Sequence, residues 1–97
     1  MLKFLKIVGE SLSPGFEHGD FVLVSKIPFL FSPPAVGDVI AFHQPGYGTL
    51  IKRIQAVDTT GMVEVIGTQP DSTDSRVFGP VRRKNIIGKV VWHIHKT

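Results

Sequence analysis

The chain has 97 residues, a formal net charge of +3 and 42% hydrophobic residues, with 10 glycines and 7 prolines. This length suits one compact domain, and the hydrophobic content excludes an intrinsically disordered chain. The chain has no cysteine, which excludes disulfides, thiolate catalysis and cysteine-bound metals. Its apolar stretches are far shorter than the ~20 residues that span a bilayer. The sequence therefore predicts a single domain over residues 1–97, without a transmembrane segment.

Short apolar runs between glycine- and proline-rich turns predict a series of β-strands. The first expected strand covers residues 3–8, and the second follows the Gly19-Asp20 turn over residues 21–25. The segment 27–34 contains three prolines and two phenylalanines, which is incompatible with a regular helix. We therefore expect an apolar loop there.

Four more strands are expected in the rest of the chain, and none of its segments has the sustained periodicity of a helix. They cover residues 39–42, 49–57, 62–66 and 86–94. Residues 44–48 predict a hairpin turn, residues 67–80 a long loop, and Gly88 a bulge or corner in the last strand. The expected fold is mostly β: an antiparallel coiled sheet or partly open barrel.

A serine lies on a turn between the first two expected strands. Ser11 belongs to the run Gly9-Glu10-Ser11-Leu12-Ser13-Pro14. A serine hydroxyl is a poor nucleophile unless a neighbouring base takes its proton. Our candidate for this base is Lys52, in the longest expected strand. Lys52 and Arg53 point to opposite faces of a strand, so one of them must point inward or to an edge.

Three stretches, taken in order, resemble the successive boxes of the type I signal peptidase family. They are the serine run at 9–14, then residues 37–40 with 51–54, and then Ser72-Thr73-Asp74-Ser75-Arg76-Val77-Phe78-Gly79-Pro80 with 87–90. The resemblance covers nearly the whole chain. The last run also resembles that of compact, anchorless relatives, the maturation proteases of nickel superoxide dismutase.

The resemblance implies peptide-bond hydrolysis by a Ser/Lys dyad, with Ser11 as nucleophile and Lys52 as general base. A lysine acts as a base only when it is neutral, and its ordinary pKa is about 10.4. Burial among apolar side chains lowers the pKa of a lysine. The candidates for this environment are Leu50, Ile51 and Ile54.

The resemblance also assigns supporting roles. Ser72 would orient the lysine amine, and Asp74 and Arg76 would pair to hold the Ser72 loop. The backbone N–H of Ser11 would form the oxyanion hole alone, because Gly9 occupies a position where some members carry a serine.

The chain departs from the family pattern in two boxes. Leu12 stands where the family usually has Met, and Gly15 where it often has Thr. Residues 67–69, Gly-Thr-Gln, replace the usual Gly-Asp-Asn, with one residue fewer before Ser72. The large insertion and membrane anchor of the bacterial enzymes are not expected here.

Two other functions stay open. One is a self-cleaving repressor-type Ser/Lys protease, and the other is a non-catalytic descendant that binds peptides along a sheet edge. For the main reading, the resemblance implies a precursor protein with small residues before the cleavage site as substrate, and it implies no cofactor. A cytoplasmic, soluble location is favoured, with a peripheral membrane location as the alternative.

Three further features have weaker interpretations. The run Arg82-Arg83-Lys84 is read as a solvated turn, not as a nucleic-acid or lipid patch. The loop at 27–34 either folds against the sheet or is exposed as a membrane or partner contact. His93 and His95 lie on one side of a strand, but two ligands are weak evidence for a metal.

Overall fold

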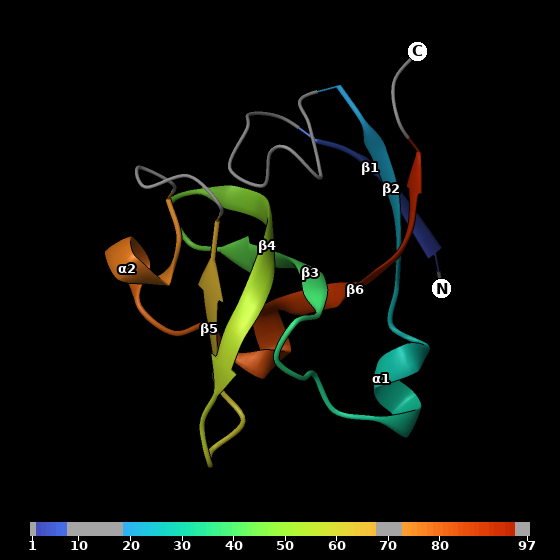
Figure 1. Cartoon of the computed structure of the whole chain (residues 1–97). Coiled ribbons are helices and arrows are strands. Elements are labelled where there is room, and N and C mark those ends of the chain that lie inside the picture. The colour runs from blue at the N-terminus through green and yellow to red at the C-terminus, as the bar shows by residue number, and fades with distance from the viewer. Residues whose placement is uncertain (1, 8–18, 68–72, 95–97) are drawn as a thin grey trace.

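The computed structural model describes residues 2–7, 19–67 and 73–94, and six strands form one antiparallel sheet (Figure 1). The order in the sheet is β1-β2-β6-β3-β4-β5, so β1 and β5 are its two edges and it does not close into a barrel. The strands are β1 Leu2–Lys6, β2 Phe21–Ser25, β3 Val39–Gln44, β4 Gly48–Val57, β5 Val63–Ile66 and β6 Ile86–Ile94. The predicted mostly-β antiparallel fold is confirmed.

Strand β3 is central because it is buried on both faces. Side chains alternate along a strand, so Ile40 and Phe42 pack on one face and Ala41 on the other. The first cluster comprises Ile40, Phe42, Ile54, Val63, Val65, Val81 and Ile86. The second comprises Ile7, Val22, Val24 and Ala41. The sheet therefore curls so that β1 and β2 cover the face opposite the first cluster.

Strand β6 joins β1 and β2 on one side of the sheet to β3, β4 and β5 on the other. Its first half pairs with β3 and its second half pairs with β2, and the register shifts once along each pairing. A Cβ atom at Gly88 would lie 2.7 Å from the backbone oxygen of Ser25, closer than real Cβ atoms come. The expected corner at Gly88 is thus a close approach of β2 to β6.

Two segments expected as loops contain single helical turns. Helix α1, Pro28–Phe31, lies in the 27–34 segment, and α2, Ser75–Phe78, lies in the 67–80 segment. The prolines do not prevent α1. Pro28 stands in the first turn, where a backbone N–H would have no hydrogen-bond partner within the helix, and the next proline follows the helix end. A 3₁₀ turn, Arg83–Asn85, precedes β6. None of the helices in the described residues is long and apolar enough to cross a membrane.

Replacement of Gly88 by alanine should lower the free energy of unfolding by about 1–3 kcal/mol, because backbone atoms of β2 must shift to admit the new Cβ. Urea unfolding followed by circular dichroism measures this change. Gly61→Ala is the matched control: Gly61 has φ +88° and open space around it, so the variant carries backbone strain alone, about 1 kcal/mol. An unchanged unfolding free energy for Gly88→Ala would contradict the close approach.

Candidate active site

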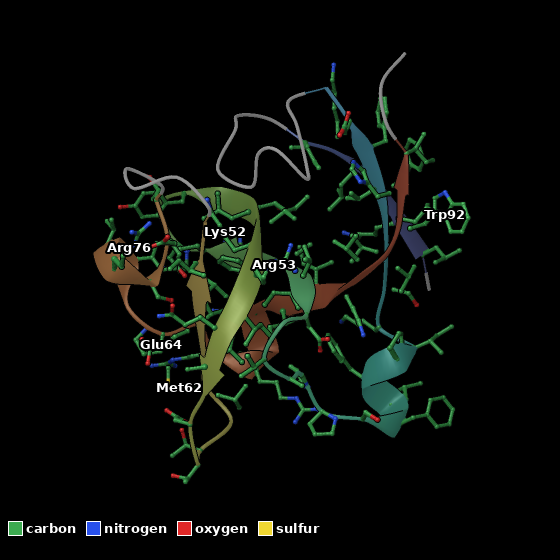
Figure 2. All side chains as sticks on the ribbon, in the orientation of Figure 1. Lys52, Arg53, Met62, Glu64, Arg76 and Trp92 are labelled. Carbon is green, nitrogen blue, oxygen red and sulfur yellow. The ribbon has the colours of Figure 1, made fainter. Side chains whose placement is uncertain are left out.

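Lys52 is the inward member of the Lys52–Arg53 pair. It lies in β4 opposite Ile40 of β3, and only 4% of its surface is exposed. Arg53 is exposed and donates a hydrogen bond to the backbone oxygen of Gly37, 3.2 Å away. Figure 2 shows Lys52 on the upper part of β4, toward Arg76. The expectation that one of the two basic residues points inward is confirmed, and that residue is Lys52.

The surroundings of Lys52 shift its pKa. Leu50 and Ile54 pack in or against the first cluster, on the Lys52 face of β4, whereas Ile51 packs against the second cluster on the other face. The expectation that Ile51 helps to bury Lys52 is therefore wrong. Burial lowers the pKa of Lys52; the negative charge of Asp74 raises it, and the positive charge of Arg76 lowers it again. A lysine in this setting is closer to a usable base than an exposed one.

Asp74 and Arg76 form the pair that the sequence predicted. Asp74 is fully buried; its Oδ1 accepts from the backbone N–H and the Nε of Arg76, both at 3.0 Å, and its Oδ2 accepts from Nη2 at 2.8 Å. The Gly67 amide donates to Oδ2 at 2.9 Å. Burial alone would raise the pKa of Asp74, but these hydrogen bonds and the Arg76 charge lower it to about 2.

The Asp74 carboxylate fixes both ends of the segment that carries Ser72. It caps the first turn of α2 through the Arg76 amide and holds Gly67 at the end of β5. Ser75 adds a second link, because its Oγ accepts from the Val65 amide at 2.8 Å. Ser72 itself lies outside the described residues. The structure thus brings together Asp74 and Arg76, the predicted loop-holding pair, close enough to Lys52 to affect its pKa.

Ser11 also lies outside the described residues, in the segment 8–18, but both ends of this segment are fixed. The Ile7 amide donates to the Asp20 oxygen at 2.7 Å, and the Gly19 amide donates to the Ile7 oxygen at 2.9 Å. Ile7 is a member of the second cluster, against which Ile51 of β4 packs. The two described ends of the segment therefore lie together, and one of them, Ile7, belongs to the cluster against which the Lys52 strand packs Ile51.

The sequence did not predict a contact between the buried Asp20 and the partly buried His93. Asp20 is 1% exposed, and its Oδ2 lies 2.7 Å from Nε2 of His93 in β6. The two residues are far apart in sequence, so only the β2–β6 pairing could have indicated their contact. His93 thus has a carboxylate contact, and the described residues contain no group of three or more His, Cys, Asp or Glu that could hold a metal. His95 lies outside the described residues.

Lys52→Met should stabilise the protein at neutral pH, by on the order of 1 kcal/mol, because methionine fills the site without a charge to desolvate. Burial lowers the pKa of Lys52 in the folded state below its ordinary value. At pH values between the folded-state and the unfolded-state pKa, the unfolded chain therefore binds more protons. The wild type should therefore gain stability as pH rises through this window, and the advantage of the variant should shrink. Urea unfolding at several pH values measures both trends. Arg53→Met is the control, because it removes an exposed charge from the same strand and leaves Lys52 in place.

Asp74→Asn should destabilise the protein at pH 7, because the variant loses the charge-assisted bonds with Arg76. The folded-state pKa of Asp74 is about 2 against an ordinary 3.8, so its ionisation contributes on the order of 2 kcal/mol above pH 4. This contribution is lost as pH falls from about 4 toward 2. Thermal unfolding of both proteins across this range tests it. A difference in stability that stays constant down to pH 2 would contradict the assignment.

The chain is similar to known proteins over nearly its whole length. The family model described as signal peptidase, peptidase S26, matches residues 1–61 and 59–95. The break between the two matches falls in the turn between β4 and β5. A probable signal peptidase I-1 of Synechocystis sp. (strain ATCC 27184 / PCC 6803 / Kazusa) is 46% identical over 132 positions, which cover 89% of this chain and 67% of the relative.

A second relative, the signal peptidase I of Leptolyngbya laminosa, is 28% identical over 139 positions, which cover 93% of this chain and 68% of the relative. Both alignments are longer than the 97 residues of this chain, so both relatives contain extra residues within the matched region. The break in the family match indicates that these extra residues are inserted at the position of the β4–β5 turn. The family match over nearly the whole chain and the identity with the Synechocystis protein show that the chain belongs to the signal peptidase family, peptidase S26.

Proposed function

We propose that this peptidase is a serine endopeptidase that removes an N-terminal leader or signal peptide from a precursor protein through a Ser11–Lys52 dyad. The observation that carries the proposal is the burial of Lys52 on the inward face of β4, which lowers its pKa. Membership of the signal peptidase family supports the reaction class and a precursor protein as substrate. We also infer that residues 1–97 form one catalytic domain.

In the proposed reaction, neutral Lys52 takes the proton of the Ser11 hydroxyl while Ser11 Oγ attacks the scissile carbonyl carbon. The backbone N–H of Ser11 stabilises the oxyanion that forms. The Lys52 ammonium then gives its proton to the leaving amine as the peptide bond breaks, which leaves an acyl-enzyme. Water loses a proton to Lys52 and attacks the ester, and the proton returns to Ser11 as the shortened product leaves.

The Asp74–Arg76 pair has an electrostatic role in this proposal. A lone carboxylate beside Lys52 would stabilise the ammonium form and so would oppose the loss of its proton. Arg76 pairs with Asp74 through two side-chain hydrogen bonds and has the opposite effect on the pKa of Lys52. The pair thus holds the Ser72 loop while adding little net charge next to the base. Ser72 would then orient the amine with a neutral hydroxyl.

An extended substrate would bind along an exposed sheet edge, where main-chain hydrogen bonds give affinity and shallow pockets select small side chains. The preference for small residues before the cleavage site rests on the family resemblance. Two alternatives remain for the test: a protease that cleaves its own chain, and a protein that binds the precursor without cleaving it.

Ser11→Ala and Lys52→Met should each lower kcat/KM for a precursor about a thousandfold or more, since each removes one member of a unit that acts together. The measurement is cleavage of precursors from the same source, read by mass spectrometry. Arg53→Met is the matched control, because it removes the positive charge of the exposed neighbour and leaves Lys52 in place. Wild-type activity in Lys52→Met would contradict the dyad.

The same assay separates the alternatives and tests the base. The rate should rise with pH through the lowered pKa of Lys52 and then level off, because only neutral Lys52 can accept the proton. Fragments of the chain itself, without precursor cleavage, would indicate the self-cleaving alternative. Precursor binding by the wild type without any cleavage would indicate the non-catalytic one.

A further inference from the structure

Asp20 connects three strands at the place where the segment 8–18 meets the described sheet. It directly precedes β2, and its backbone oxygen accepts from the amide of Ile7, directly after β1, at 2.7 Å. Its side-chain Oδ2 lies 2.7 Å from Nε2 of His93 in β6. Strands β1, β2 and β6 lie side by side in the sheet (Figure 1). Asp20 therefore contacts the neighbours on both sides of its own strand, one through its backbone and the other through its side chain.

The side-chain contact is largely withdrawn from water. The side chain of Asp20 is 2% exposed and that of His93 is 18% exposed. A carboxylate oxygen only accepts hydrogen bonds, so the contact is satisfied when Nε2 of His93 carries the hydrogen. Removing a carboxylate from water is costly, and apolar side chains in the same space are often as stable as a buried charged pair. The direction that the contact imposes on the chain therefore explains the pair better than a gain in stability does.

The pair adds a third fixed point to the ends of the segment that contains Ser11. The amide of Gly19 donates to the oxygen of Ile7 at 2.9 Å, so the two described ends are already joined to each other. The His93 contact joins them to β6 as well. Strand β6 also pairs with β3, and β3 pairs with β4, the strand of Lys52. Through this contact, the segment ends are thus held relative to the strands that carry the proposed base.

We propose that Asp20 and His93 are positioning residues for the proposed nucleophile. Their contact fixes where the segment containing Ser11 leaves and rejoins the sheet, and so fixes the approach of Ser11 to Lys52. This inference rests on the proposed function, and neither side chain is assigned a contact with the substrate. Small displacements of a reacting group lower the rate of the chemical step strongly. Loss of the contact should therefore lower kcat and leave KM nearly unchanged.

The experiment measures kcat and KM for precursor cleavage by the full chain and its His93 variants. His93→Leu removes the hydrogen-bond donor and should lower kcat about 10- to 100-fold. His93→Gln should keep most of the activity, because its amide nitrogen lies as many bonds from Cβ as Nε2 of histidine does and can donate to Asp20. A residue that only fills space would show the opposite order, since leucine is the more apolar replacement at a mostly buried site.

Gly88→Ala is the matched control for loosening of the same two strands. It strains the pairing of β2 with β6 at its other end, beside Ser25, and should leave kcat near the wild-type value. His43→Leu is a second control, which removes an exposed histidine from β3. Circular dichroism verifies that each variant is folded in the assay. An equal loss of kcat in Gly88→Ala, no recovery in His93→Gln, or a change in KM alone would overturn the proposal.

A second variant covers the case in which His93→Leu does not fold. Asp20→Asn keeps the size of the side chain but removes its charge, which weakens the contact with His93. It should lower kcat in the same direction, by a smaller factor. A folded Asp20→Asn with wild-type kcat would overturn the proposal in that case.

Two further measurements separate this proposal from the proposed function. Loss of activity in Ser11→Ala together with full activity in His93→Leu would overturn the positioning role alone, whereas wild-type activity in Ser11→Ala would overturn the dyad itself. Amide hydrogen exchange of Ile7 and Gly19, followed by NMR, does not depend on catalysis. It should be faster in His93→Leu than in the wild type and near the wild-type rate in Gly88→Ala. Unchanged exchange in His93→Leu would show that the contact does not hold the segment ends.

Discussion

The burial of one lysine amine is the constraint on which the candidate site depends. Lys52 can stay inside only because β4 is paired on both sides, with β3 and with β5, so the strand cannot rotate to expose it. A slip of one residue in the β3–β4 register would turn Lys52 outward and bring Arg53 in. The hairpin turn prevents this slip, since Gly46 and Gly48 both adopt positive φ in a short connection. The unfavourable burial of the amine is thus maintained by a local turn and by the packing of the first cluster.

The Asp74–Arg76 pair shows how a carboxylate can lie near the Lys52 amine while an arginine offsets its tendency to stabilise the ammonium form. Asp74 accepts hydrogen bonds from two separate segments, Gly67 at the end of β5 and Arg76 in α2. Those bonds hold its pKa at about 2, so the carboxylate stays charged and keeps the loop in place. The Arg76 charge counteracts its effect on Lys52. The pair therefore supports the loop, while the lowered pKa of Lys52 comes from burial and Arg76 limits the opposing effect of Asp74.

The sequence predicted what local patterns determine. Alternating side chains and turn residues located all six strands, and the last strand, 86–94, matches β6 in full. It also predicted the Asp74–Arg76 pair, through a family resemblance. It missed α1 and α2, because a single turn of four residues has no measurable periodicity, and Pro28 at a helix start reads as a breaker. The Asp20–His93 contact could not be predicted, since it depends on β2 lying beside β6 in the sheet order.

Strand β6 determines how the two halves of the proposed dyad can meet. The base lies on β4, in the part of the sheet that β6 reaches through β3, whereas the segment with Ser11 begins and ends in the β1–β2 part. His93 contacts Asp20 at the end of that segment, and Gly88 permits the close approach of β2. Both contacts belong to β6, at positions where neither side chain takes part in the proposed chemistry. Strand β6 therefore connects the strand that carries Lys52 with the two strands, β1 and β2, that flank the segment containing Ser11.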